Sequence, residues 1–195
     1  MENKTSISFK EKDQLLSILK ENRFLYTVLE GCEELGIPNY YLGAGCICQS
    51  VWNSLNHQDL MYGIADIDFV YFDPDISYEK EDAIIKKVKS RFVGSPIEID
   101  VKNEARVHLW YKNHFGHEIR PYVSLEDAID TWPTTATAIG VRLESGKLMV
   151  YAPFGVKDLF QQVVRPKKIQ ISQDVYEGKC RKWLAKWPTL TVIPW

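Results

Sequence analysis

Two aspartates lie two positions apart in an otherwise apolar stretch, Ile64-Ala-Asp-Ile-Asp-Phe-Val-Tyr-Phe-Asp73. Because side chains alternate between the two faces of a β-strand, Asp66 and Asp68 would share one face of this segment. Carboxylates so close together repel each other unless a cation lies between them. Two carboxylates completed by phosphate oxygens are a common way to hold Mg²⁺. The spacing therefore predicts a metal site on a strand, although an acidic strand end beside a loop would show the same pattern.

A glycine-containing turn precedes the aspartate pair. Tyr40 to Leu42 is predicted to be a short strand, Gly43 to Gly45 a tight turn, and Cys46 to Leu55 a helix with apolar residues at helical spacing. A turn that leads into a helix N-terminus gathers free backbone N–H groups and the positive end of the helix dipole, which suits a phosphate. Glycine also occurs at such turns for backbone reasons alone. The turn is evidence for a phosphate site only because the two aspartates follow it.

A second acidic strand is predicted downstream, in Ser95-Pro-Ile-Glu-Ile-Asp-Val-Lys-Asn103. Glu98 and Asp100 alternate with apolar residues, so one face of this strand would be acidic and the other apolar. Either acid could complete a three-carboxylate site with Asp66 and Asp68. An ordinary strand with one solvated face is the alternative interpretation of this segment.

In this order, the glycine turn, the Asp-x-Asp strand and the acidic strand resemble the nucleotidyltransferase fold of the DNA polymerase beta superfamily. The chain is more closely similar to a family of small bacterial nucleotidyltransferase-like proteins of about this length. The resemblance runs from about residue 40 to about residue 160, with a weaker echo near residues 182–188. The stretches that carry it are Gly43-Ala-Gly45, Tyr62-Gly63, Asp66-Ile-Asp68, Val101 to Tyr111, Asp130 to Arg142 and Ala152-Pro-Phe-Gly155.

The resemblance implies an α+β fold with a mixed sheet that carries three carboxylates, is flanked by helices and is followed by an extra C-terminal hairpin and helices. It also implies a metal-dependent nucleotidyltransferase that moves a nucleoside monophosphate from an NTP to an acceptor, which the sequence does not identify. Asp66, Asp68 and Asp100 would be the catalytic residues and the ligands of Mg²⁺ or Mn²⁺. Asp100 is preferred to Glu98 because it leads directly into the family-like stretch that begins at Val101.

By the same resemblance, Gly43, Gly45 and the backbone N–H of Cys46 would hold the triphosphate. Lys102 and Arg106 could neutralise phosphate charge, although either could equally be an ordinary surface residue. The superfamily usually has Gly-Ser or Gly-Gly at the helix start, where this chain has Gly45-Cys46, and a thiol is a poorer hydrogen-bond partner than a hydroxyl.

Two other functions stay open at this point. A degenerate member of the same fold would bind a nucleotide or a partner without transferring anything, and the cysteine at the helix start favours that alternative. A metal-dependent phosphohydrolase could use the same carboxylates, but the order from glycine turn to aspartates matches nucleotidyl transfer. The presence of all three acids favours an active enzyme.

Length and composition set the remaining expectations. The 195 residues are predicted to form a single domain, with N-terminal helices over about 9–34, a core over about 36–160 and a C-terminal helical extension over about 161–195. A net charge of −2 argues against broad, nonspecific binding of nucleic acid, which depends on phosphate neutralisation. The sequence shows neither an apolar signal core nor a membrane-length apolar segment, so a cytoplasmic protein without membrane contact is expected.

Overall fold

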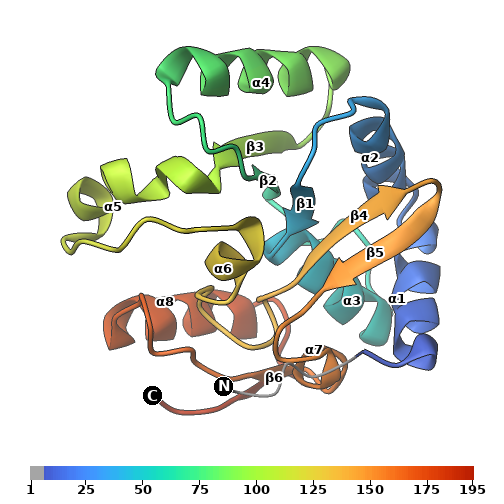
Figure 1. The fold of residues 1–195 in the computed structure, drawn as a ribbon. Coiled ribbons are helices and arrows are strands. Elements are labelled where there is room, and N and C mark those ends of the chain that lie inside the picture. Colours follow the sequence, from blue (N-terminus) through green and yellow to red (C-terminus); the bar gives the residue numbers. More distant parts are fainter. Residues whose placement is uncertain (1–6) are drawn as a thin grey trace.

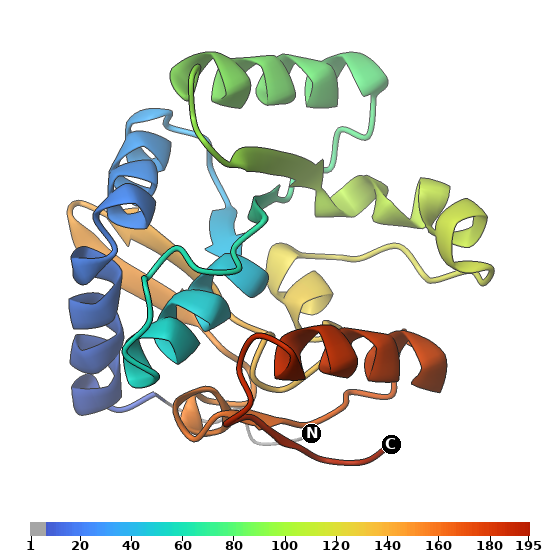
Figure 2. The same ribbon diagram turned by 180° about the vertical axis from the view of Figure 1, so that it is seen from behind.

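The centre of the fold is a sheet of five strands. The computed structural model describes residues 7–195 and is shown from two sides in Figures 1 and 2. The strand order is β3-β2-β1-β4-β5, in which β2 and β3 are parallel and the other neighbours antiparallel. The strands are β1 (Tyr40–Gly43), β2 (Asp66–Tyr71), β3 (Glu98–Asn103), β4 (Gly140–Glu144) and β5 (Lys147–Tyr151). The predicted α+β fold with a mixed sheet is confirmed.

One face of the sheet carries the main hydrophobic core. Ile67 and Phe69 are fully buried there, as the alternation around the aspartates predicts. In Figure 2 the helices that cover this face lie in front of the sheet, and α4 packs along β3 through the buried Val88. These helices are α1 (Phe9–Glu21), α2 (Arg23–Glu34), α3 (Gly45–Leu55) and α4 (Tyr78–Arg91).

The opposite face carries Asp66, Asp68 and Val70 from β2 and the polar side chains of β3. A short helix, α6 (Leu125–Ile129), packs on this face in a small cluster with Val70. At the end of β3 the chain forms a 3₁₀ turn, η1 (Glu104–Arg106), and continues into α5 (Val107–Phe115). The polar face of β2 and β3 is therefore enclosed by segments that follow it in the sequence.

The C-terminal third differs in detail from the predicted extra hairpin and helices. The β4–β5 hairpin joins the main sheet, because β4 pairs with β1. After the hairpin, α7 (Lys157–Phe160) is short, since Gln162 adopts a left-handed conformation with φ of 55°. The chain then forms β6 (Val163–Val164), α8 (Gln173–Leu184) and β7 (Thr191–Val192), with β6 and β7 paired in parallel.

Trp187 ties the end of the chain to the helix that starts at the glycine turn. Its side chain is 1% exposed, and its Nε1 donates a hydrogen bond of 2.7 Å to Oδ1 of Asn53 in α3. Its ring packs edge-on against Trp52, with 5.5 Å between ring centroids. The C-terminal segment thus contributes to the same core as the sheet and α3.

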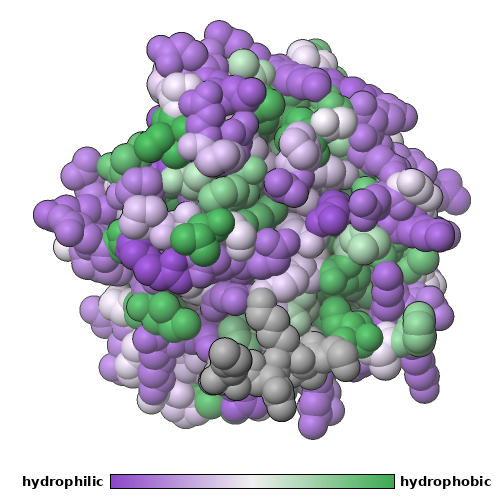
Figure 3. Space-filling view, viewed as in Figure 1, coloured by the Kyte–Doolittle hydropathy of each residue, from purple (hydrophilic) through white to green (hydrophobic). Residues whose placement is uncertain are grey.

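The outer surface is mixed in character. On the face seen in Figure 3, hydrophobic side chains form separate patches among hydrophilic ones. Over the part of the chain that the structure describes, no helix combines the length and the apolar composition that crossing a membrane requires.

Replacing Trp187 by alanine tests this attachment. We expect Trp187→Ala to lower the free energy of unfolding by about 3–5 kcal/mol, because it removes a large buried ring and leaves the Asn53 amide oxygen without its donor. Phe9→Ala, at a 90% exposed aromatic residue, is the matched control and should change stability by no more than about 0.5 kcal/mol. Urea unfolding followed by fluorescence provides the comparison, and equal effects of the two substitutions would contradict the assignment.

Candidate active site

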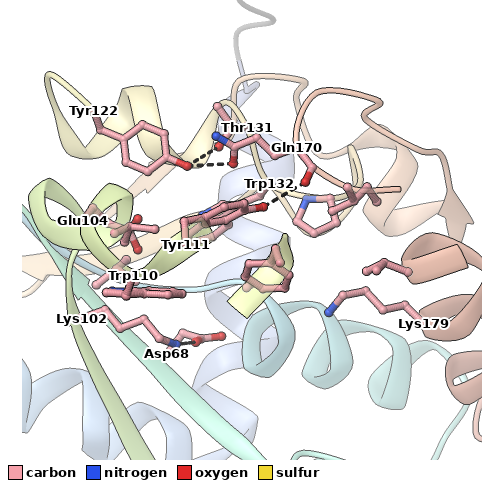
Figure 4. A pocket seen from close by; sticks show the side chains of 17 residues that line it. Asp68, Lys102, Glu104, Trp110, Tyr111, Tyr122, Thr131, Trp132, Gln170 and Lys179 are labelled. Atoms are coloured by element: carbon pink, nitrogen blue, oxygen red, sulfur yellow. Dashed lines mark hydrogen bonds and ion pairs between the residues drawn. The ribbon is translucent and has the colours of Figure 1, made fainter. Parts of the chain in front are cut away.

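Parallel pairing of β2 and β3 places the acids of the two strands opposite each other. Asp68 is in register with Asp100, and Asp66 with Glu98. The ammonium of Lys102 lies 2.5 Å from Oδ2 of Asp100 and 3.5 Å from Oδ1 of Asp68, and Figure 4 shows the Asp68–Lys102 contact. Asp68 and Asp100 therefore form an inner pair with a cation between them.

The charges of this inner pair influence one another. Burial is the largest influence on Asp68 and raises the pKa of its carboxyl; the Lys102 ammonium works against that rise, and the neighbouring Asp66 and Asp100 add to it. Burial alone would lower the pKa of Lys102, but its attraction to Asp68 and its hydrogen bond to Asp100 outweigh that effect and raise the pKa. The Lys102 ammonium therefore stays charged and occupies the position between the carboxylates where a metal ion could bind.

The outer acids lie further from this centre. Asp66 is exposed, and the Glu98 side chain is 72% exposed and approaches Nζ of Lys89 in α4 at 3.7 Å. Among residues 7–195 no group of three or more His, Cys, Asp or Glu side chains is placed to hold a metal ion. The predicted set of Asp66, Asp68 and Asp100 is thus not gathered into a preformed cage. Asp68 and Asp100 fit an ion whose remaining ligands are phosphate oxygens and water, the usual environment of Mg²⁺.

The glycine turn lies directly beside the inner pair. Gly43, the last residue of β1, is in register with Asp68. The next residue, Ala44, is the N-cap of α3; its φ of 52° and ψ of −121° belong to a region that favours glycine, and its side chain caps nothing. The first N–H groups of a helix have no intrahelical partner. The α3 N-terminus therefore presents backbone donors next to Asp68, as predicted for a phosphate site.

Gly43 is required by a close approach. A side chain at this position would place its Cβ 2.5 Å from the Trp132 ring and 3.1 Å from the carbonyl oxygen of Ile139. The indole can rest against the end of β1 only because residue 43 has no side chain. Gly43 thus ends the strand and also leaves the space that the Trp132 ring occupies.

Cys46 is a buried residue in the first turn of α3. Its side chain is buried, its thiol donates a hydrogen bond of 3.3 Å to the carbonyl of Gly43, and burial raises its pKa well above the usual value. The thiol therefore does not take the place of a serine hydroxyl at the helix start, because Ala44 occupies the N-cap. Only the backbone N–H of Cys46, with that of Gly45, remains a candidate for phosphate binding.

Arg106 is not brought to the site. Its Nε lies 2.7 Å from Oε2 of Glu81 in α4, and its guanidinium also donates to the carbonyl of Ile76. These contacts hold the side chain against α4, so the charge near the inner pair comes from Lys102. The alternative interpretation of Arg106, as a structural residue, agrees with this placement.

A cavity of about 270 Å³ opens above Asp68 and Lys102. Ala44 lies at its edge, and α8 directs the Lys179 side chain into it from the far side (Figure 4). Five aromatic side chains contribute to the remaining wall. The main lining residues are Trp110, Tyr111, Phe115, Tyr122, Trp132 and Gln170.

Glu104 is a buried acid in the wall of this cavity. It is 5% exposed, and within the described residues its carboxyl has neither a hydrogen bond nor an ion pair. Burial raises the pKa of Glu104 to about 8; the nearby Lys102 ammonium opposes the rise, and Asp68 and Asp100 add to it. The preceding residue fixes its position, because Oδ1 of Asn103 accepts hydrogen bonds from the N–H groups of Ala105 and Asp73, each 3.1 Å long.

Neither Glu104 nor the aromatic wall was identified by the sequence reasoning. The available signals were two family-like stretches, Val101 to Tyr111, which contains Glu104, and Asp130 to Arg142, which contains Trp132. Those stretches alone do not show that Tyr122, Trp132 and Gln170 face the same space. Their approach depends on the way α6 and the later loops fold back over the sheet.

Replacing Glu104 by glutamine should alter the pH dependence of stability. Above the ordinary glutamate pKa of 4.5 the unfolded chain loses this proton, whereas the folded protein keeps it until about pH 8. The contribution of Glu104 to stability therefore falls as the pH rises through that window. Glu104→Gln, which stays neutral, should be more stable than the wild type by roughly 1–3 kcal/mol at pH 7 and equally stable near pH 4. Urea unfolding across this range, with the exposed Glu98→Gln as control, tests the effect; parallel pH profiles for all three proteins would contradict it.

Comparison with known proteins agrees with this arrangement. A solved structure described as an NMR structure that reveals a CCA-adding enzyme head domain superposes with a TM-score of 0.77 at 28% identity, covering 96% of this chain and 98% of the other. No curated protein matches the sequence. Residues 30–192 match the model of a family described as Nucleotidyltransferase. With its sheet, its glycine turn and its paired aspartates, the chain belongs to this nucleotidyltransferase family and has the polymerase beta-like fold.

Proposed function

We propose that this protein transfers a nucleoside monophosphate from an NTP to an acceptor, using Mg²⁺ or Mn²⁺. The observation that carries the proposal is the position of the inner pair. Asp68 and Asp100 face each other with the Lys102 ammonium between them, directly beside the N-terminus of α3. Carboxylates for a metal and backbone donors for a triphosphate are thus adjacent.

In this proposal Asp68 and Asp100 hold the metal together with the phosphates of the NTP. A bound divalent ion would neutralise phosphate charge and stabilise the attacking and leaving oxygens. The N–H groups of Gly45 and Cys46 bind the triphosphate. Lys102, whose ammonium contacts both carboxylates, would exchange these contacts for a phosphate when a metal takes its place. Asp66, on the exposed end of β2, would be a further ligand of the metal on the outer side of the site.

The reaction forms one bond and breaks one. A nucleophilic oxygen or nitrogen of the acceptor attacks the α-phosphorus, and the bond from that phosphorus to the bridging oxygen of the β-phosphate breaks. Pyrophosphate leaves with the bonding electrons. Asp100, the more exposed member of the inner pair, accepts the proton of the acceptor directly or through water. The protein mainly positions charges, as in other phosphoryl transfers.

Binding of a nucleotide without transfer is the second candidate. Two observations favour it: Lys102 already neutralises the inner pair, and Ala44 provides no hydroxyl at the helix start. In that case the fold would bind an NTP through the helix N-terminus and Lys102, with no need for a metal. The two candidates differ in whether the divalent ion and Asp68 are required for binding.

Replacing Asp68 by asparagine separates them. If the protein is a transferase, we expect NTP to bind more tightly in the presence of Mg²⁺. Because Asp68→Asn removes a metal ligand, it should weaken this Mg²⁺-dependent binding by about tenfold or more and reduce turnover by about 100-fold. Glu98→Gln is the matched control, since Glu98 lies outside the inner pair, and its binding should equal that of the wild type. Calorimetry with ATP, CTP, GTP and UTP, with Mg²⁺ or with EDTA, makes the comparison.

Binding that is equally tight in EDTA and unchanged by Asp68→Asn would support the second candidate. Absence of NTP binding by folded wild-type protein at concentrations well above micromolar would contradict both.

A further inference from the structure

The aromatic cavity is continuous with the proposed phosphate site. Ala44, Asp68 and Glu104 are among the residues that line it, whereas Asp66 and Asp100 are not. Ala44 marks the helix start where the triphosphate would bind, and Asp100 marks the side where the acceptor would be deprotonated. The cavity therefore lies on the side of the donor nucleotide.

The walls of the cavity suit a flat aromatic group. Trp110 and Tyr111 are partly stacked on each other, with 6.2 Å between centroids and an interplanar angle of 30°, and Trp132 adds a third ring beside Gly43. Aromatic side chains bind nucleobases by stacking, with little preference among bases. The walls would thus supply affinity for a base, and base selection must come from polar groups.

The hydroxyl groups of the wall are already engaged. Tyr111 donates to the backbone carbonyl of Gln170 at 2.9 Å, and Tyr122 donates to the Gln170 side-chain oxygen at 2.8 Å. Glu104 differs from them, because this largely buried residue lines the cavity and its carboxyl has no hydrogen bond or ion pair to any of residues 7–195. Burying a polar group without a partner costs free energy, which a ligand that bonds to it would recover.

We propose that the cavity holds the nucleobase of the NTP and that Glu104 is the residue that bonds to its hydrogen-bonding edge. The inference rests on the proposed function, because it assumes that the triphosphate lies at the start of α3. Glu104 is then a specificity-determining residue of the donor site, on η1 and separate from the metal-binding carboxylates.

The protonation of Glu104 decides which edge it can bind. The charged and titratable groups around it are Lys102, Asp68, Asp100 and Tyr122. With a pKa of about 8 the carboxyl is mainly neutral at pH 7 and offers one donor and one acceptor, whereas the ionised form only accepts. Guanine is the base that presents two adjacent donors, the ring N1–H and the exocyclic amino group. Raising the pH through 8 should therefore shift the preference toward GTP.

Calorimetry on the full chain with Mg²⁺ and each of ATP, CTP, GTP and UTP tests the proposal, with inorganic tripolyphosphate as the probe of the phosphate site alone. We expect the wild type to bind its preferred NTP about tenfold more tightly than the weakest one. Glu104→Leu should reduce that spread to about twofold and leave tripolyphosphate binding unchanged. Glu104→Gln, which keeps a donor and an acceptor, should retain a spread that no longer depends on pH between about 6.5 and 8.5. Thermal unfolding confirms that both variants fold.

The outcomes separate the two levels of the proposal. If NTPs and tripolyphosphate bind but Glu104→Leu leaves the spread among the four NTPs as in the wild type, or if the wild type shows no spread, the role of Glu104 is wrong while the proposed function stands. If neither NTPs nor tripolyphosphate bind to the folded wild type, the proposed function fails and the role of Glu104 fails with it.

Discussion

The site depends on holding two carboxylates close together on neighbouring parallel strands. Parallel strands need a crossover, and α4 supplies it between β2 and β3 and packs along β3. The pairing brings Asp68 opposite Asp100, where their repulsion must be offset by a cation. Lys102, two residues after Asp100 and on the same face of the strand, places its ammonium between them. β3 thus contains both the negative charge of Asp100 and the positive charge of Lys102 that offsets it.

The two faces of the sheet divide the work of folding and function. The face under α1, α2 and α3 buries Ile67, Phe69 and the other members of the main core, and that burial stabilises the fold. The other face carries features that cost stability: an alanine in a glycine-like conformation at residue 44 and a buried acid at residue 104 that pairs with none of residues 7–195. Such costs are typical of binding sites, where a ligand completes what the protein leaves unpaired.

The local parts of this arrangement could be predicted from the sequence, because they depend on short-range alternation. The periodicity of two around Asp66 and Asp68 and the helical spacing after Gly45 each predict the observed element. Register could not be predicted, and it is register that opposes Asp68 to Asp100 and leaves Glu98 near Lys89. The helix begins at Gly45, one residue before the predicted start at Cys46, because its N-cap is Ala44, whose backbone conformation no local pattern predicts.

Long-range packing limits what the sequence can show about the cavity. Tyr122, Trp132 and Gln170 are separated from β2 by fifty residues or more, and no local pattern shows that they meet Glu104. Two-residue strands such as β6 and β7 carry no periodicity at all, so the C-terminal segment could only be predicted as helical. Family resemblance supplied the order of the motifs, and the structure supplied the contacts between them.

The central claim is that the inner pair binds a divalent ion only together with the phosphates of a nucleotide. Electron paramagnetic resonance of Mn²⁺, titrated into the protein with and without NTP, measures this directly. The account predicts weak Mn²⁺ binding to the protein alone, tight binding when NTP is present, and loss of the tight binding in Asp100→Asn. Mn²⁺ binding that is equally tight without nucleotide, or that is unaffected by Asp100→Asn, would contradict it.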